Sequence, residues 1–188
     1  MNVHRSNRIG HRRDFGRLLN DLQLTGDAVE VGVHRGEFAE MLLTSWRGRM
    51  LYLVDPWRHL PGYVDPVADG DRDEDYAAAM KRMLPFQDRV RVCRNLSVEA
   101  ASAFDSLSLD FVYIDADHAR DAVLTDIKAW WPLVRKGGIL AGHDWFGGWG
   151  MNVRWAVNSF FAERVDNSAV FTIRDDDGAG SWFIHKRD

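Results

Sequence analysis

The chain has 188 residues, which suits one domain, and hydrophobic residues make up 46% of it, enough for a sizeable core. Its formal net charge of -4 gives no overall basic field, so the composition does not indicate a nucleic-acid partner. The single cysteine, Cys93, excludes an internal disulfide and agrees with a cytoplasmic location, and no apolar run is long enough to span a membrane.

The first 24 residues combine a basic beginning with a helical pattern. Arginine and histidine residues gather in residues 4–13, a composition that is usually a solvated arm. Helical spacing follows in the apolar residues Phe15, Leu18, Leu19 and Leu22. We therefore expect residues 1–24 to form an arm and a helix that precede a domain over residues 25–188.

An apolar run at residues 28–33 predicts a strand, which leads through a glycine turn into a helix at residues 37–46. Gly32 and Gly36 in such a turn let the backbone approach a nucleotide closely. Glu30 would repel the pyrophosphate of a dinucleotide. The same acid suits the cationic ammonium and sulfonium of S-adenosylmethionine (SAM), which carries no phosphate.

A second strand, at residues 50–55, ends in Asp55. One crossover helix separates the two strands, so right-handed βαβ geometry places their ends side by side. An acid at this point can accept hydrogen bonds from both ribose hydroxyls, in NAD as well as in SAM proteins. The combination of Glu30 and Asp55 favours SAM, and an NAD-type oxidoreductase is the alternative.

The rest of the chain continues to alternate between strands and helices. A proline-rich and glycine-rich connection at residues 56–75 has the length of a functional lid. Strands are expected at residues 89–93, 109–115, 139–142, 169–173 and 181–185, and helices at residues 76–84, 98–104, 118–134 and 149–164. We expect Ser97 to cap one helix, Pro132 to break another, and residues 136–138 to form a turn. This order predicts an α/β fold with a Rossmann-like, doubly wound, mostly parallel seven-stranded sheet and a C-terminal antiparallel hairpin.

Acids and histidines follow two of these strands. Asp115, Asp117 and His118 come after one strand, and His143 and Asp144 come after the next. Ligands of open α/β sheets bind at the carboxyl ends of the strands, where these groups would meet. Two carboxylates and an imidazole can bind a divalent cation, although Asp117 or His118 could simply cap the following helix.

These residues lie in a longer sequence pattern, which comprises residues 30–36, 54–57, 110–118, Asp126, 130–133 and 137–145. The pattern resembles the class I SAM-dependent methyltransferases. Within them it is most similar to the small group of macrocin-type and cephalosporin-type O-methyltransferases. The likeness spans about residues 25–150, and its most specific part is the block from Asp110 to Trp145.

The resemblance implies roles for the matching positions. Glu30, Gly32, Val33 and Gly36 would line the methionine part of SAM, and Asp55 would hold the ribose. The segment from Asn95 to Ser97 would contact adenine. At the ends of the strands at residues 109–115 and 139–142, the resemblance assigns the metal to Asp115 and Asp144, with Asp115 beside the cofactor. It assigns the role of general base to Asp117.

Two residues depart from the family pattern. His143 stands where metal-dependent relatives usually have an acid, and His34 stands where many methyltransferases have a glycine. Imidazole is a poor ligand for Mg²⁺ but suits Mn²⁺ and other transition metals. Either a metal other than Mg²⁺ binds Asp115, His143 and Asp144, or His143 is itself a base and no metal binds. His118 is another candidate base.

We therefore expect O-methylation of a hydroxylated small molecule, such as a sugar or a natural product. A non-catalytic SAM-binding protein and an NAD-type oxidoreductase are the alternatives. The sequence at residues 115–118 lacks the Asn/Asp-Pro-Pro-aromatic loop of base methyltransferases, which argues against a nucleic-acid acceptor. The acceptor pocket is open or is completed by a second subunit of a homo-oligomer. Among the tryptophans, we expect Trp130, Trp131, Trp149 and Trp155 to pack in the fold, and Trp57 or Trp145 to wall the pocket.

Overall fold

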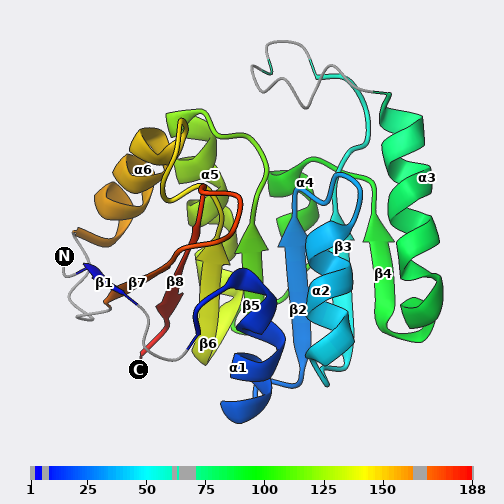
Figure 1. The fold of residues 1–188 in the computed structure, drawn as a ribbon, viewed down its shortest axis with the longest axis horizontal. Helices are drawn as coiled ribbons and strands as arrows, with labels where there is room; N and C mark the ends of the chain where they lie inside the picture. The colour runs from blue at the N-terminus through cyan, green and yellow to red at the C-terminus, as the bar shows by residue number, and fades with distance from the viewer. Residues whose placement is uncertain (1–2, 6–8, 61–62, 64–70, 163–168, 188) are drawn as a thin grey trace.

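The computed structural model describes residues 3–5, 9–60, 63, 71–162 and 169–187. A central sheet has helices on both of its faces (Figure 1). Within the connection expected at residues 56–75, residues 61–62 and 64–70 lie outside the described residues. No helix in the described parts of the chain combines the length and the apolar character needed to cross a membrane.

Eight strands form the sheet in the order β1-β7-β8-β6-β5-β2-β3-β4. Among the strands of the described residues, only the pairs β6–β8 and β7–β8 are antiparallel, so the predicted mostly parallel sheet with a C-terminal hairpin is confirmed. The strands are β1 (Val3–Arg5), β2 (Asp27–Val31), β3 (Met50–Val54), β4 (Val90–Cys93), β5 (Leu109–Ile114), β6 (Val134–Gly142), β7 (Val170–Ile173) and β8 (Ser181–His185). The eighth strand, β1, was not predicted, and it pairs in parallel with β7 at the edge of the sheet.

The helices cover the two faces of the sheet in two groups (Figure 1). One face carries α1 (Phe15–Asp21), α2 (Glu37–Ser45) and α3 (Arg72–Met83), and the other carries α4 (Ser97–Ala101), α5 (Arg120–Trp130) and α6 (Gly150–Ala162). Short 3-10 turns are η1 (Arg12–Asp14), η3 (Leu84–Arg89) and η4 (Trp131–Leu133). Because both faces are covered, every residue of β5 is buried.

One element boundary agrees with the sequence prediction and another does not. Pro132 ends α5 as expected, and only the single 3-10 turn η4 follows. The predicted turn at residues 136–138 is wrong, because β6 already begins at Val134. Gly137 has φ 76 and its N–H donates to the carbonyl of Lys186 at 2.8 Å, so these glycine peptides extend the pairing of the sheet.

Helix α1 shares the core with the sheet. The ring of Phe15 is fully buried and has four aromatic neighbours, with centroids 5.3 to 6.3 Å away, namely Phe38, Phe111, Tyr113 and Phe183. Trp130 and Trp131 are buried as expected. The proposed division between residues 24 and 25 stays a prediction, but the contacts of Phe15 tie α1 to β5 and β8.

We expect Phe15→Ala to lower the free energy of unfolding by about 3–5 kcal/mol, because it leaves a cavity between α1 and the sheet. Leu84→Ala is the matched control: Leu84 is 65% exposed, and its loss should change stability by less than about 0.5 kcal/mol. Urea denaturation of both variants measures this. Equal midpoints for the two variants would show that α1 is dispensable to the core.

Candidate active site

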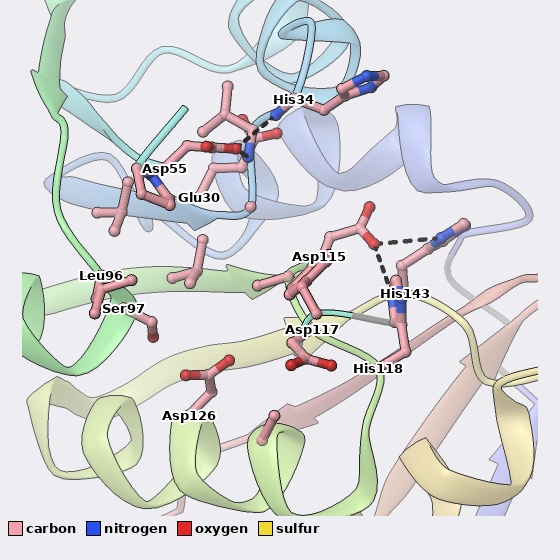
Figure 2. A pocket seen from close by; sticks show the side chains of 18 of the residues that line it. Glu30, His34, Asp55, Leu96, Ser97, Asp115, Asp117, His118, Asp126 and His143 are labelled. Carbon is pink, nitrogen blue, oxygen red and sulfur yellow. Dashed lines mark hydrogen bonds and ion pairs between the residues drawn. The ribbon is translucent and has the colours of Figure 1, made fainter. Parts of the chain in front are cut away.

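A cavity of about 960 Å³ opens at the carboxyl ends of the parallel strands. It is lined by the glycine turn after β2, by the end of β3, and by the groups that follow β5 and β6 (Figure 2). Its size is at the upper end of the range for small-molecule sites. The predicted site residues that line it are Glu30, Gly32, Val33, Asp55, Ser97, Asp115, Asp117, His118, His143 and Asp144, whereas Gly36 and Asn95 do not.

The glycine turn is shaped by close backbone contacts. Gly32 has φ 84, and a Cβ at this position would overlap the carbonyl oxygen of Asp115. Gly36 has φ 77, begins α2, and lies against Ala79 of α3, where a Cβ would be only 3.2 Å from the Cα of Ala79. Neither position therefore accepts a side chain without a shift of the backbone. Gly36 shapes the turn from outside the cavity.

Asp55 holds this turn with both of its carboxylate oxygens. Its Oδ2 accepts the N–H groups of Val33 at 3.0 Å and His34 at 2.9 Å, and its Oδ1 accepts the N–H of Trp57 at 2.7 Å. His34 and Trp57 both have positive φ, with values of 51 and 41, which is unusual for residues other than glycine. A carboxylate has about four lone-pair positions, so with three N–H groups bound Asp55 retains capacity for about one ribose hydroxyl.

The tryptophans near the site differ from the prediction. Trp57 and Trp145 are buried, and neither lines the cavity. Trp149, which was expected only to pack, lines the cavity, and its ring stacks on His118 with centroids 5.9 Å apart.

Glu30 is a buried acid in the cavity wall. It is 2% exposed, and no described residue forms a hydrogen bond with its Oε2. Burial, aided by the negative charges of Asp115 and Asp55, raises the pKa of Glu30 well above its ordinary value. A buried carboxyl with an unpaired oxygen is costly, so a cationic or hydrogen-bond-donating ligand would stabilise it.

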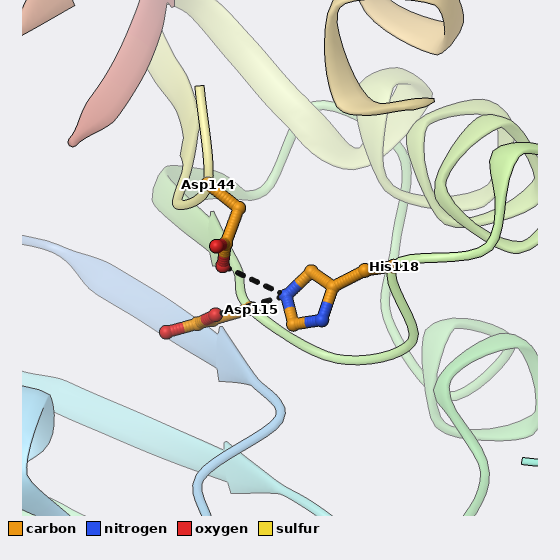
Figure 3. A group of neighbouring side chains, drawn as sticks. All are labelled: Asp115, His118 and Asp144. Atoms are coloured by element: carbon orange, nitrogen blue, oxygen red, sulfur yellow. Dashed lines mark ion pairs between the residues drawn. The ribbon is translucent and has the colours of Figure 1, made fainter. Parts of the chain in front are cut away.

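A cluster of carboxylates and imidazoles occupies the other side of the cavity (Figure 3). The Nε2 atom of His118 lies 2.9 Å from Asp144 Oδ2 and 3.4 Å from Asp115 Oδ1. The Nδ1 atom of His143 lies 3.1 Å from the same Asp144 oxygen. Asp144 itself has φ 57, a backbone strain of the kind that clusters at functional sites.

These contacts set the charges of the cluster. Burial opposes a charge on His118, but its contacts with Asp115 and Asp144 outweigh burial and raise its pKa to about 11. Burial also opposes a charge on His143, and the hydrogen bond to Asp144 raises its pKa nonetheless. Burial alone would raise the pKa of Asp144, but the two imidazoles hold it below its usual range. At neutral pH His118 is therefore protonated and Asp144 is ionised, and the hydrogen bond to Asp144 favours the protonated form of His143.

Three charged residues that the sequence analysis did not assign to the site join this cluster. Arg12, from the segment expected to be a solvated arm, lies 3.1 Å from Asp177 and 3.9 Å from Asp115. Asp175 and Asp177, from the turn between β7 and β8, lie 3.9 Å and 3.1 Å from the Nε2 of His143. No local pattern could have indicated these contacts, because they join the two ends of the chain.

Two groups of side chains could hold a metal ion. The ligand atoms of Asp115, His118 and Asp144 lie within 4.8 Å of one another, and so do those of His143, Asp175 and Asp177. The predicted set of Asp115, His143 and Asp144 is thus divided: His118 takes the place beside the two acids, and His143 also faces the hairpin turn. Because Arg12 lies closer to Asp177 (3.1 Å) than to Asp115 (3.9 Å), the first group is the better cation site.

The remaining predicted residues also have defined positions. Asp117 does not cap α5, whose N-cap residue is Ala119; its Oδ1 accepts the N–H of Ala119 at 2.8 Å in the loop before the helix, and Asp117 also lines the cavity. Ser97 does not cap α4 as expected: Leu96 is the N-cap residue, and the Ser97 hydroxyl accepts the indole N–H of Trp130 at 2.9 Å.

The chain was compared with known proteins. A protein family described as a methyltransferase domain matches residues 29–145. A comparison with curated proteins gives no match.

Solved structures share the fold at low sequence identity. The O-methyltransferase TomG of Streptomyces achromogenes, involved in tomaymycin synthesis and solved in complex with SAM, is 14% identical, with a TM-score of 0.68 over 94% of this chain and 80% of that chain. An O-methyltransferase from Bacillus cereus in complex with S-adenosylhomocysteine (SAH) is 16% identical, with a TM-score of 0.65 over 96% and 84% of the two chains. A Clostridium thermocellum protein, provisionally described as an rRNA methylase, is 15% identical, with a TM-score of 0.64 over 96% and 98%.

We expect Glu30→Gln to stabilise the ligand-free protein at pH 8, by at least about 2 °C in Tm, which corresponds to about 1 kcal/mol in a domain of this size. The raised pKa of Glu30 means that folding favours the protonated carboxyl, so the wild type loses stability as pH rises from the unfolded-state pKa through the folded-state pKa. Glutamine has no such pH dependence, and the gain in Tm should shrink toward pH 5. Calorimetric scans at both pH values test this, and a gain that is larger at pH 5 would contradict the assigned charge state.

Proposed function

Because the chain belongs to the methyltransferase-domain family, we propose that it transfers a methyl group from SAM to a hydroxyl group of a small molecule. The match covers residues 29–145, the region in which the sequence resembles the class I methyltransferases, and confirms that resemblance. The narrower likeness to macrocin-type and cephalosporin-type enzymes stays a prediction.

One observation carries the proposal: a single cavity joins the buried acid Glu30 to the cluster around Asp115 and His118. The unpaired oxygen of Glu30 fits an ammonium group, and Gly32 allows the ligand to approach the backbone. A pyrophosphate would instead meet Glu30 and the acids Glu37 and Glu40 in the first turn of α2. The cavity therefore suits SAM better than NAD.

Asp117 is the residue that we assign as general base. His118 is protonated at neutral pH through its acidic partners, so it cannot readily accept a proton, and the hydrogen bond to Asp144 likewise favours the protonated form of His143. Asp117 lines the cavity beside the cluster, and its Oδ1 keeps its orientation through the N–H of Ala119 (Figure 2). A positioned base typically contributes about 10²–10⁴-fold to the rate.

The reaction requires one proton acceptor, because the hydroxyl group loses its proton when it is methylated. SAM supplies an electrophilic methyl group on a sulfonium. The acceptor oxygen forms a bond to the methyl carbon as the carbon–sulfur bond breaks, and the electron pair of the broken bond stays on sulfur. The hydroxyl proton goes to Asp117. The ordered cavity wall aligns the two reactants, which lowers the entropic cost of the encounter.

Asp115, His118 and Asp144 would hold a divalent ion, because two carboxylates and an imidazole converge there. Such an ion, when bound, would lower the pKa of the acceptor hydroxyl. The mixed donor set favours Mn²⁺ or another transition metal over Mg²⁺. Without an ion, the imidazoles of His118 and His143 already lie against the two acids.

Calorimetry with SAM, SAH and NAD tests the proposed donor, and mass spectrometry of a panel of hydroxylated metabolites tests the transfer. We expect SAM to bind with a micromolar Kd, about −8 kcal/mol. Tighter binding of NAD would favour an oxidoreductase instead. SAM binding without methylation of any compound in the panel would favour a non-catalytic SAM-binding protein.

We expect Asp117→Asn to lower kcat by roughly 10²-fold, the effect of losing a base, while SAM affinity stays within about threefold. Asparagine keeps the acceptor for the Ala119 N–H, so the start of α5 is preserved. Asp121→Asn, a change in the nearby first turn of α5 at a residue that also lines the cavity, is the matched control and should retain activity. Equal activities of the two variants would remove Asp117 from the mechanism.

We expect a chelator to abolish activity, and Mn²⁺ to restore it better than Mg²⁺. Asp144→Asn should weaken the response to Mn²⁺, because it removes one of the three converging ligands. Activity assays with and without a chelator, together with elemental analysis of the protein, measure this. Full activity in excess chelator, in protein without detectable metal, would leave charge balance by the histidines as the role of the cluster.

A further inference from the structure

Asp126 is a buried acid in the cavity wall that the proposed mechanism does not use. It lies on α5, is 6% exposed, and borders the cavity. Figure 2 shows its carboxyl group near Ser97, on the side of the cavity away from His118 and His143. The sequence pattern contained Asp126 but gave it no role.

A chain of hydrogen bonds orients this carboxyl. The Ser97 hydroxyl oxygen accepts the indole N–H of Trp130. The hydroxyl hydrogen of Ser97 is therefore free to be donated to the Asp126 carboxyl group, with which Ser97 forms a hydrogen bond. Trp130 is fully buried in the core, which fixes the chain from behind. One Asp126 oxygen is thus engaged by protein, and the group retains further hydrogen-bonding capacity toward the cavity.

The surroundings favour the neutral form of this acid. Burial, partly opposed by the Ser97 hydroxyl and aided by the negative charge of Asp117, raises the pKa of Asp126 to about 7. On α4, Glu99 is a further acid that lines the same cavity. A neutral carboxyl group presents a hydrogen-bond donor and an acceptor side by side.

This side of the cavity is also the place left for the base of SAM. Glu30 suits the ammonium group, and the methyl group must lie beside Asp117, where transfer occurs. Leu96 and Val98 flank Ser97 in the chain and Ala122 precedes Asp126 by one turn of α5; all three are small or apolar and line the cavity. These surfaces can contact the flat faces of a purine.

We propose that Asp126 recognises the adenine of SAM through a pair of hydrogen bonds to its N1 and N6 edge. The hydroxyl of the carboxylic acid donates to N1, and its carbonyl oxygen accepts one N6–H as well as the Ser97 hydroxyl. Asp126 is then a specificity residue for the nucleobase. The inference rests on the proposed function, because it requires SAM as the ligand of the cavity.

Binding of SAH and of its 1-deaza analogue, which has a C–H in place of N1, tests the proposal by calorimetry. We expect the wild type to bind the analogue about tenfold more weakly, the order of effect for one lost hydrogen bond. Asp126→Ala should bind SAH about tenfold more weakly and no longer distinguish the two compounds. Asp126→Asn should retain both affinity and discrimination, because its amide presents the same donor and acceptor. Asp121→Asn is the control for a lost acid on the same helix.

A pH series gives an independent measurement. Adenine binds the protonated acid, so SAH affinity of the wild type should fall relative to Asp126→Asn as pH rises above about 7. Effects of Glu30 are common to both proteins and cancel in this ratio. Thermal unfolding without ligand verifies that each variant is folded.

Discrimination by Asp126→Ala equal to that of the wild type would overturn the assignment of Asp126 while leaving the proposed function intact. A ratio of affinities that does not change with pH would equally contradict recognition by the neutral acid. Failure of the wild type to bind SAH at all would instead overturn the proposed function, and this inference with it.

Discussion

The site depends on one close contact between two strand ends. Beyond β2 the backbone at Gly32 passes so near the Asp115 carbonyl that only glycine fits, and the Asp115 N–H donates to the Val31 carbonyl at 2.7 Å. This contact brings the turn that carries the cofactor-side residues against the acids after β5. A wider separation would divide the cavity into two unrelated halves, one with Glu30 and one with His118.

The charges in the cavity are balanced in two different ways. The acids Asp115, Asp144 and Asp177 have cationic neighbours in His118, His143 and Arg12, so they are stable within the protein. No described residue forms a hydrogen bond with the Oε2 of Glu30, and burial raises the pKa of Asp126 to about 7. The groups that the protein leaves unsatisfied are the ones we assign to the ligand, and sites of this kind trade stability for function.

The sequence predicted what depends on local pattern and on strand order. Alternating strands and helices fix where the carboxyl ends of parallel strands meet, which is why the meeting of Glu30, Asp55 and Asp115 in one cavity could be foreseen. Contacts between distant segments could not. The inclusion of Arg12 depends on how the N-terminal segment packs, and the place of His118 beside Asp115 and Asp144 depends on the path of the loop after β5. The boundary of β6 was missed because Gly137 reads as a turn when its partner Lys186 is unknown.

The contact between the segment at Arg12 and the hairpin turn affects how the protein is assembled. The Arg12 N–H donates to Asp175 at 2.6 Å across 163 positions of sequence, and the Arg12 side chain reaches Asp177. Contacts of such long range form late in folding, because a large loop must close before they stabilise anything. During synthesis, the acids after β5 and β6 emerge from the ribosome well before the hairpin that completes their charge balance. A competent site is therefore a property of the finished chain, and a folding intermediate with β2 to β6 in place would hold the acids without Asp175 and Asp177 to position Arg12 beside them.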